Sequence, residues 1–414
     1  MKHIVILGGG TAGSMMANHL YKKLPRDKHK ITVLSEDEFH YYQPGFLFIP
    51  FDLYKEKDIL KPAKSCIASG VNFIQTKVEG IDAKSNFVVI RGGEKITYDL
   101  LIIATGARVN ASETEGMDDP EVWRKTVFDF YTPNGAIALR EALKNFNGGN
   151  LVVHITDMPI KCPVAPLEFA FLADWWLHKK GIRNKTEITF VTPLSGAFTK
   201  PTAAHELGYL IQKKNIHMIP DFAISQVAPG KIHSYNKKEV PYDLLVTIPL
   251  NMGVPLIEDS GLGDELNYVP TDPGTLRSKK HENIFVIGDA TDLHTSKAGS
   301  VAHFEADILT ENIIRKLEGK DLLSEYDGHS NCFVETGYGK AISLDFNYVQ
   351  EPVHGSYPLP FLGPLSLLKE TRINHWGKLA FRWVYWNMLV KAVPMPVGAK
   401  MPLAGKKIPP ATHH

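Results

Sequence analysis

Cysteine is scarce in this sequence. Its 414 residues include only Cys66, Cys162 and Cys332, too few for a disulfide scaffold. No stretch reaches the roughly 18 apolar residues of a membrane-spanning helix, and no signal segment precedes the first predicted strand. The net charge of +1 argues against nucleic acid as a partner. A chain of this length and apolar content is expected to form two or three globular domains.

A second glycine-rich loop is also missing. The strand predicted at residues 150–155 is followed by residues 157–168, which contain three prolines and Cys162. A nicotinamide-dependent reductase would have Gly-x-Gly-x-x-Gly there, because only glycine lets the backbone approach a pyrophosphate. We therefore predict that the second domain does not bind NAD(P)H. Another electron donor is then required, and Cys162 is placed where it could act.

One glycine loop is present at the start of the chain. Residues 8–13 spell Gly-Gly-Gly-Thr-Ala-Gly, between an apolar strand predicted at 3–7 and a helix predicted at 13–23. In such a loop the backbone N–H groups and the helix N-terminus bind a pyrophosphate. Strands and helices alternate further along the chain, which predicts doubly wound parallel sheets.

Two more segments complete a predicted flavin site. Residues 104–106 (Ala-Thr-Gly) and 288–290 (Gly-Asp-Ala) follow predicted strands, and with the glycine loop they predict FAD. Where a carboxylate normally binds the ribose, Ser35 is followed by Glu36, and whether Glu36 substitutes stays open. The predicted cofactor-binding residues are Gly8, Gly10, Thr11, Ala12, Gly13, Ser35, Glu36, Gln43, Val78, Ala104, Thr105, Gly106, Gly288, Asp289 and Lys297.

With these motifs the chain resembles the sulfide:quinone oxidoreductase family of the flavoprotein disulfide reductases. The resemblance spans nearly the whole chain. Its most specific part is Cys-Pro-x-Ala-Pro-x-Glu at residues 162–168 together with the late Cys332. Further matching segments are Thr295-Ser296-Lys297, Gly337-Tyr338-Gly339-Lys340, Asn374-His375-x-Gly377-Lys378 and Tyr385-Trp386.

The resemblance implies an activity and roles for the two cysteines. Sulfide would be oxidised to zero-valent sulfur or polysulfide, and the electrons would pass through FAD to a membrane quinone. Cys332 would be the thiol next to the flavin, and Cys162 the thiol that accepts sulfide. Thiolate is the reactive form, so lowered pKa values are expected for this pair. Cys66 is interpreted as a packing residue.

Glu168 and Lys297 complete the predicted catalytic set. Glu168 is interpreted with equal weight as a base near the thiols and as a first-turn residue that complements a helix dipole. The resemblance places Lys297 near the flavin or the quinone headgroup, where a cation stabilises reduced flavin. The alternative for Lys297 is an ordinary surface lysine.

The sequence departs from the family at two positions. Many members carry a third cysteine before the Cys-Pro segment, but residues 107–161 contain none. Related flavocytochrome c dehydrogenases attach FAD through a cysteine in the segment that here spans residues 40–44, which also has none. We therefore predict non-covalent FAD, while polysulfide length and release stay open. No metal site is predicted, because no histidine pair has convincing spacing.

The C-terminal part predicts a membrane-surface element. From Lys369 to Lys407 there are eight basic residues and one acidic residue, interspersed with tryptophans. Residues 371–391 predict a helix that lies in the interface of a bilayer, with 357–368 as a second insertion loop, so that residues 357–391 would contact lipid. The alternative is a core helix that caps the domain. Phe333 and Phe381 are predicted to flank the quinone.

These observations predict an α/β protein with two Rossmann-like dinucleotide-binding-type domains and a C-terminal amphipathic membrane-binding segment. The FAD-binding domain would comprise residues 1–106 and 251–320. Residues 107–250 would form the second domain, which carries Cys162, and 321–414 the quinone and membrane region, which carries Cys332. We expect a peripheral protein of a prokaryotic cytoplasmic membrane. The membrane face, the quinone type and the oligomeric state, a homo-oligomer included, stay open.

Three other functions remain. A soluble sulfide dehydrogenase that reduces a cytochrome is disfavoured by the basic, aromatic C-terminus. An NADH:quinone reductase is disfavoured by the missing second glycine loop. A non-catalytic flavin-bearing assembly or sulfur-carrier protein would fit the missing third cysteine.

Overall fold

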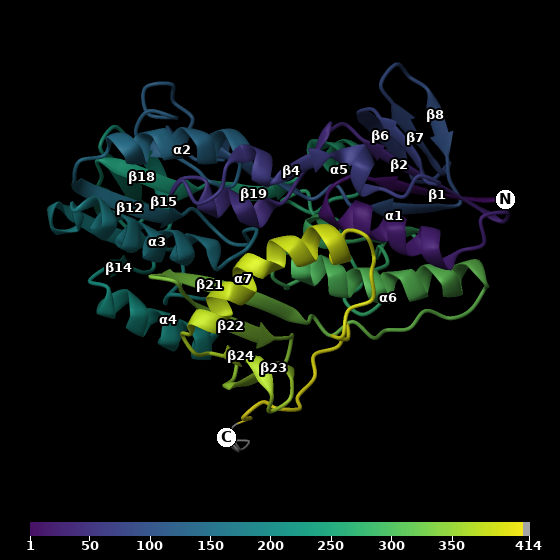
Figure 1. Ribbon diagram of the computed structural model, residues 1–414. Helices are drawn as coiled ribbons and strands as arrows, with labels where there is room; N and C mark the ends of the chain where they lie inside the picture. Colours follow the sequence, from purple (N-terminus) through teal and green to yellow (C-terminus); the bar gives the residue numbers. More distant parts are fainter. Residues whose placement is uncertain (409–414) are drawn as a thin grey trace.

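The computed structural model describes residues 1–408, and two five-stranded parallel sheets form the framework of that part of the chain, one in each half of the molecule (Figure 1). The first sheet has the order β20-β9-β1-β2-β5. Its strands are β1 (Lys2–Leu7), β2 (His29–Ser35), β5 (Asn72–Gln75), β9 (Leu100–Ile103) and β20 (Ile284–Val286). The late strand β20 therefore returns to a sheet whose other four strands lie within residues 2–103.

Side chains of β1 alternate between two apolar layers. Ile4 and Ile6 pack into the main core, which includes residues of α1 (Thr11–Lys23) and α6 (Gly299–Leu317). Val5 and Leu7 pack into a second cluster on the opposite face. The strand is buried on both faces, as parallel strands usually are. On the second face lie the antiparallel strands β6 (Val78–Asp82), β7 (Phe87–Ile90) and β8 (Lys95–Thr97), with α5 (Pro255–Asp259).

The second sheet repeats this design with the order β11-β18-β12-β13-β14. Its strands are β11 (Val127–Phe128), β12 (Gly149–Ile155), β13 (Thr186–Val191), β14 (His217–Ile219) and β18 (Leu244–Ile248), with helices α2 (Pro133–Asn145), α3 (Ala165–Lys180) and α4 (Pro201–Lys213). A small antiparallel sheet adds β15 (Ile224–Ala228), β16 (Lys231–Ser234) and β17 (Glu239–Pro241). The chain passes between the halves along the antiparallel pair β10 (Ala107–Asn110) and β19 (Leu250–Gly253).

The C-terminal part forms a third layer below the two halves (Figure 1). Its sheet has the order β21-β22-β24-β23, with β21 (Ser330–Gly337), β22 (Lys340–Phe346), β23 (Gly355–Leu359) and β24 (Gly363–Leu367). Helix α7 (Arg372–Val384) packs on this sheet, and β21 lies against α3. Cys332 on β21 is thereby brought to the segment that carries Cys162. The short pair β3 (Phe39–Tyr41) and β4 (Leu60–Pro62) precedes a turn in which Cys66 is buried by packing, as predicted.

The α/β fold with parallel dinucleotide-type sheets is confirmed, and the predicted domain boundaries stay a prediction. The helix predicted at 371–391 is only partly right. Helix α7 ends at Val384 and continues as a π-helical turn over Tyr385–Leu389, where Tyr385 and Trp386 are buried. Those two aromatics therefore pack inside the protein, although they were predicted within a lipid-facing helix. Within residues 1–408 no helix is both long and apolar enough to span a bilayer.

Candidate functional site

A cavity of about 330 Å³ lies at the carboxyl edge of the first sheet and reaches into the second half of the molecule. At one end it is lined by the segments that follow β1, β9 and β20. At the other end it is lined by Tyr131, Cys162, Glu168 and Lys378. Carboxyl ends of parallel strands converge at one edge of a sheet, which is where open α/β folds bind ligands.

The glycine loop is tightly packed on its protein side and free of protein atoms on the side that faces the cavity. A Cβ atom on Gly13 would lie 1.9 Å from the Gly8 carbonyl oxygen, and one on Gly8, whose φ is +105°, would lie 2.3 Å from that of Ala104. A Cβ on Gly10 or Gly106 would meet no protein atom within 4 Å, and both residues line the cavity. The loop is therefore packed against its own backbone and that of Ala104, and the side on which a pyrophosphate would bind stays free of protein atoms.

The neighbouring polar groups also fit a dinucleotide. The buried Thr105 Oγ1 has no hydrogen-bond partner within residues 1–408. Asp289 lines the cavity, and burial raises the pKa of its carboxyl group, with Lys297 and Lys161 opposing that shift. A hydroxyl-rich ligand would satisfy both groups, because buried polar groups are normally hydrogen-bonded.

Most of the predicted cofactor residues line this cavity, and four do not. The lining residues among them are Gly8, Gly10, Thr11, Ala12, Gln43, Ala104, Thr105, Gly106, Gly288, Asp289 and Lys297. Gly13 packs behind the loop, Ser35 is buried at the end of β2, and Val78 belongs to the second apolar cluster.

Asp37 supplies the carboxylate at the cavity, and Glu36 does not. Glu36 points away to an exposed ion pair with Arg91 at 2.8 Å, whereas Asp37 lines the cavity. The sequence analysis expected the ribose-binding carboxylate at the end of β2, at Ser35 or Glu36. It missed Asp37 because a bend follows β2 and brings the carboxylate two residues beyond Ser35 to the cavity.

Cys162 stands in a constrained turn just before α3. Its φ of +44° lies in the left-handed region, which is uncommon for a residue with a side chain. Its N–H donates to the Lys297 carbonyl at 2.8 Å, and its carbonyl accepts from the Tyr131 hydroxyl at 3.1 Å. These two contacts fix the thiol at the cavity wall, and neither Tyr131 nor this backbone geometry was visible in the sequence.

Cys162 lines the cavity, whereas the buried Cys332 does not, although Cys332 is close enough for its charge to act on the Cys162 thiol. Burial raises the pKa of the Cys162 thiol well above its usual value, and the negative charges of Glu168 and Cys332 add to that rise. Burial raises the pKa of Cys332 to about 12, a hydrogen bond from Ser296 opposes the shift, and Glu168 adds to it. All three cysteines are free thiols. The lowered pKa values expected for this pair are thus not found in the protein alone.

Glu168 forms a buried ion pair with Lys378. Its Oε1 accepts from Lys378 Nζ and, at 2.6 Å, from the Glu335 N–H. Burial raises the pKa of Glu168, and Lys378 opposes that shift. Burial lowers the pKa of Lys378, but Glu168 outweighs it, so the pKa of the lysine is raised. Lys378 lines the cavity and is not a lipid-facing cation as predicted, although its motif was visible in the sequence.

Lys297 is buried and lines the same cavity, so the surface-lysine alternative is wrong. Its Nζ donates to the carbonyls of Thr291 at 2.6 Å and Asp289 at 3.2 Å, and lies 4.2 Å from the centre of the Tyr268 ring. Burial lowers the pKa of Lys297, whereas Asp289 and Glu305 raise it. A cation is thereby held beside the glycine-rich end of the cavity.

The two aromatics predicted for quinone lie outside the cavity lining. Phe333 on β21 is half-buried, and its ring faces Gly377 of α7, while its carbonyl accepts from Lys378 Nζ at 3.3 Å. The half-buried Phe381 has its ring centre 6.4 Å from that of Tyr42. Their role toward a quinone stays a prediction.

The C-terminal segment also reaches the glycine loop. The Tyr385 hydroxyl makes hydrogen bonds of 2.6 Å with both Thr11 Oγ1 and His40 Nε2, and His40 Nδ1 lies 3.3 Å from Ser14 Oγ. Tyr385 lines the cavity. Sequence motifs marked Tyr385 but gave no indication of this contact.

Comparison with known proteins agrees with this geometry. Residues 2–153 match the family model described as pyridine nucleotide-disulphide oxidoreductase. The mitochondrial sulfide:quinone oxidoreductase of Dictyostelium discoideum is 28% identical over 405 residues, which cover 95% of this chain and 89% of the relative. The sulfide:quinone oxidoreductase structure from Aquifex aeolicus is 23% identical, with a TM-score of 0.78 and coverage of 94% and 92%. The resemblance to sulfide:quinone oxidoreductases is confirmed.

The same fold also occurs in another setting. A chain in the Tetrahymena thermophila mitochondrial ATP synthase structure matches with a TM-score of 0.76 at 20% identity, over 94% of this chain and 96% of that one. Fold alone therefore does not decide activity, and the side chains at the cavity must. The relatives include a mitochondrial and a bacterial enzyme, so they do not assign this chain to a prokaryotic membrane.

Proposed function

We propose that this chain is an FAD-dependent sulfide:quinone oxidoreductase, which oxidises sulfide to zero-valent sulfur and reduces a quinone. The observation that carries the proposal is one cavity with a dinucleotide cradle at one end and Cys162, Glu168 and Lys378 at the other. A dinucleotide cofactor bound there, FAD, would supply two-electron transfer between the thiols and a quinone, and the reduced quinone would take up two protons. The segments at 8–12, 104–107 and 287–289 would hold it.

The thiol step needs both cysteines. The two free thiols are first oxidised to a disulfide, with loss of two protons and with the quinone as the final acceptor of the two electrons. Hydrosulfide then attacks this Cys162–Cys332 disulfide, the bond between the two protein sulfurs breaks, and a persulfide forms on Cys162. Cys332 leaves as a thiolate, so atoms and charge balance, and the sulfide sulfur is oxidised as the disulfide is reduced. A leaving thiolate is favoured by a nearby cation and disfavoured by a nearby anion.

The Glu168–Lys378 pair supplies both kinds of charge. Lys378 lowers the pKa of each thiol, and Glu168 raises it. Because burial raises the pKa of Glu168, its carboxylate can take up a proton more readily than an exposed glutamate. We assign Lys378 the stabilisation of the departing thiolate, and Glu168 the acceptance of the proton that hydrogen sulfide loses when it forms the attacking hydrosulfide.

We place a bilayer against the exposed apolar surface of the C-terminal part. On α7 this surface comprises Ile373, Trp376, Leu379 and Trp383, of which the tryptophans are 69% and 63% exposed. The loop between β23 and β24 adds Phe361 and Leu362, which are 86% and 82% exposed. The exposed Lys369 and Arg372 lie next to it. Tryptophans with flanking cations are typical of interfacial helices, so we propose a peripheral membrane protein.

Two alternative functions, an NADH:quinone reductase and a non-catalytic assembly protein, are each disfavoured by a feature of this structure. In an NADH:quinone reductase a glycine loop would follow β12, where this chain has the Cys162 turn. A non-catalytic assembly protein would have no need for the paired Glu168 and Lys378 beside a thiol, and burying such a pair is costly.

The test is anaerobic mixing of the flavin-replete protein with sulfide, followed by a short-chain quinone. We expect rapid bleaching of the visible flavin band, recovery on addition of quinone, and no bleaching in Cys332→Ser. Absence of bleaching in the flavin-replete, cysteine-intact protein would overturn the proposal. Bleaching by NADH would favour the reductase.

A further inference from the structure

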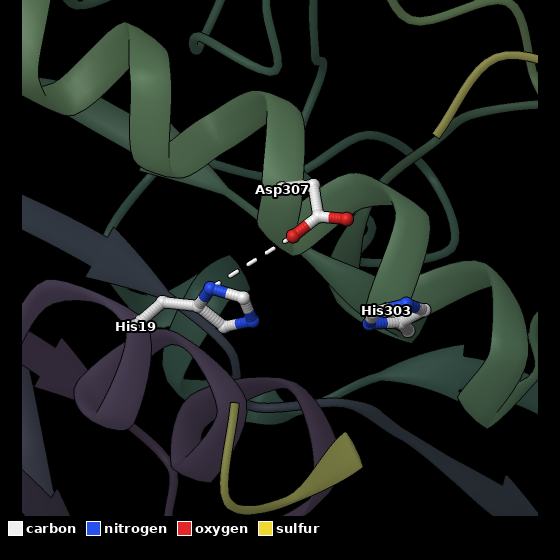
Figure 2. A group of neighbouring side chains, drawn as sticks. All are labelled: His19, His303 and Asp307. Carbon is white, nitrogen blue, oxygen red and sulfur yellow. Dashed lines mark ion pairs between the residues drawn. The ribbon is translucent and has the colours of Figure 1, made fainter. Parts of the chain in front are cut away.

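Three potential metal ligands meet where α1 packs against α6. His19 lies on α1, and His303 and Asp307 lie one turn apart on α6. Their ligand atoms all lie within 4.8 Å of one another. Figure 2 shows His19 and Asp307 facing each other across the space between the helices, with the His303 ring beside them. His303 and Asp307 share one face of α6 because residues four apart on a helix lie on the same side. His19 of the facing helix α1 completes the group.

The two histidines are buried without the hydrogen bonds that buried rings normally have. Within residues 1–408, neither ring nitrogen of His303 has a partner, and His19 Nε2 has none. His19 Nδ1 is 3.8 Å from Asp307 Oδ1, too far for a hydrogen bond. His19 is 8% and His303 5% exposed. Unsatisfied buried nitrogens require an explanation, and an absent ion is one.

The ligand chemistry points to one class of ion. Two imidazoles and a carboxylate suit Zn²⁺ and its neighbours such as Co²⁺, with water in the remaining position. The Asp307 side chain is 38% exposed, which leaves a path for the ion. In a tetrahedral zinc site the ligand atoms lie about 3.3 Å from one another. Small rotations of the three side chains would bring their ligand atoms from within 4.8 Å to that spacing.

The surrounding charges are mixed. Lys22 and Lys23 lie near His19, and Lys23 also acts on Asp307. Lys22 Nζ is occupied by the carbonyls of Lys391 and Ala392, at 2.7 and 2.9 Å. The positive charge of Lys23 would repel a bound cation, so moderate affinity is expected.

We propose that His19, His303 and Asp307 bind one divalent transition-metal ion of the zinc type and that this ion joins α1 to α6. Both helices begin at the cofactor cavity, α1 at Thr11 and α6 at Gly299. The ion would therefore hold together the two helices that support the dinucleotide cradle. This site lies apart from the thiols and is independent of the proposed function.

The test is calorimetric titration of the chelator-treated holoprotein with Zn²⁺, with Co²⁺ absorption as a second probe. The starting protein carries His413→Ala and His414→Ala, because adjacent terminal histidines bind metals by themselves. A second background, Cys162→Ser with Cys332→Ser, removes the thiols. We expect one ion per chain in both backgrounds, and a rise in the midpoint of thermal unfolding with Zn²⁺.

The site variants are Asp307→Asn and His303→Ala, and the control is His205→Ala, whose side chain is 84% exposed on α4. We expect affinity to fall about tenfold or more in both site variants and to be unchanged in the control. Asp307→Asn keeps the shape of a partly exposed side chain, so its metal-free unfolding should match the parent. Equal affinity in parent and site variants, or loss of binding in either background, would overturn the proposal.

Discussion

The two halves of the molecule have the same parallel sheet but different loops at the corresponding edge. Between β1 and α1 lie three residues, 8–10, all glycine, which leave space for a ligand. Between β12 and α3 lie residues 156–164, nine residues that hold Cys162 against the Lys297 carbonyl. One edge is therefore built to receive a dinucleotide, and the other to present a thiol to the same cavity. The sheets set where chemistry can occur, and the loops decide which chemistry.

Removal of the thiol at the second edge should have the largest effect. Cys162→Ser is expected to slow sulfide-dependent flavin bleaching on the order of a thousandfold, since serine cannot form the persulfide. Stopped-flow absorbance measures this. The control is Cys66→Ser, which alters a buried packing cysteine that does not line the cavity and should bleach at the parental rate. Equal rates in Cys162→Ser and the parent would show that the second edge has no thiol role.

Closing the first edge should have the next largest effect. Gly13→Ala places a Cβ 1.9 Å from the Gly8 carbonyl oxygen, so the loop must shift, and flavin content should fall about tenfold or more. The flavin-to-protein absorbance ratio measures this. Gly208→Ala in α4 is the matched control, because its Cβ would meet nothing within 4 Å.

Gly10→Ala separates the contribution of the glycine loop to protein packing from its contribution to FAD binding. Its Cβ would meet no protein atom within 4 Å but would enter the cavity side. We expect normal unfolding of the flavin-free protein together with weaker FAD binding. Parental FAD affinity in Gly10→Ala would contradict the assignment of this cradle to the dinucleotide.

The ion pair beside Cys162 should give opposite pH shifts. Lys378→Met removes a charge that lowers both thiol pKa values, so the thiolate-dependent rate should rise only at higher pH. Glu168→Gln removes a charge that raises them, so the profile should move to lower pH. Rates of bleaching measured across pH test this. Shifts in the same direction would exclude control of the thiols by this pair.

Glu168 and Lys378 should also contribute non-additively to the free energy of unfolding. Each single variant leaves one buried charge unpaired, which costs about 3–5 kcal/mol. The double variant Glu168→Gln/Lys378→Met should lose less than the sum, as denaturant unfolding can measure.

The smallest effect is expected outside both edges. Trp376→Ser with Trp383→Ser should weaken binding to phosphatidylglycerol-containing vesicles about tenfold, because both exposed rings would leave the interface. Co-sedimentation measures the bound fraction. Tyr235→Ser changes a residue that is 78% exposed in the second half and should bind like the parent. Unchanged binding by the tryptophan variant would remove this surface from the proposal.

Local pattern was enough to predict several parts of this protein. Alternating apolar strands and a glycine loop specify a parallel sheet with a ligand edge, since backbone conformation depends on neighbouring residues. The Cys-Pro segment at 162–168 and Cys332 were recognisable by resemblance, and the missing second glycine loop predicted that no nicotinamide cofactor binds there.

Only the tertiary structure decided which distant side chains meet. It paired Glu168 with Lys378, placed Asp37 at the cavity while Glu36 paired with Arg91, and brought His19 to His303 and Asp307. Most of these contacts join helices and loops that lie far apart in the chain. The position of Asp37 depends instead on the bend that follows β2. Their partners depend on how the elements pack, a property that the periodicity of a single segment does not contain.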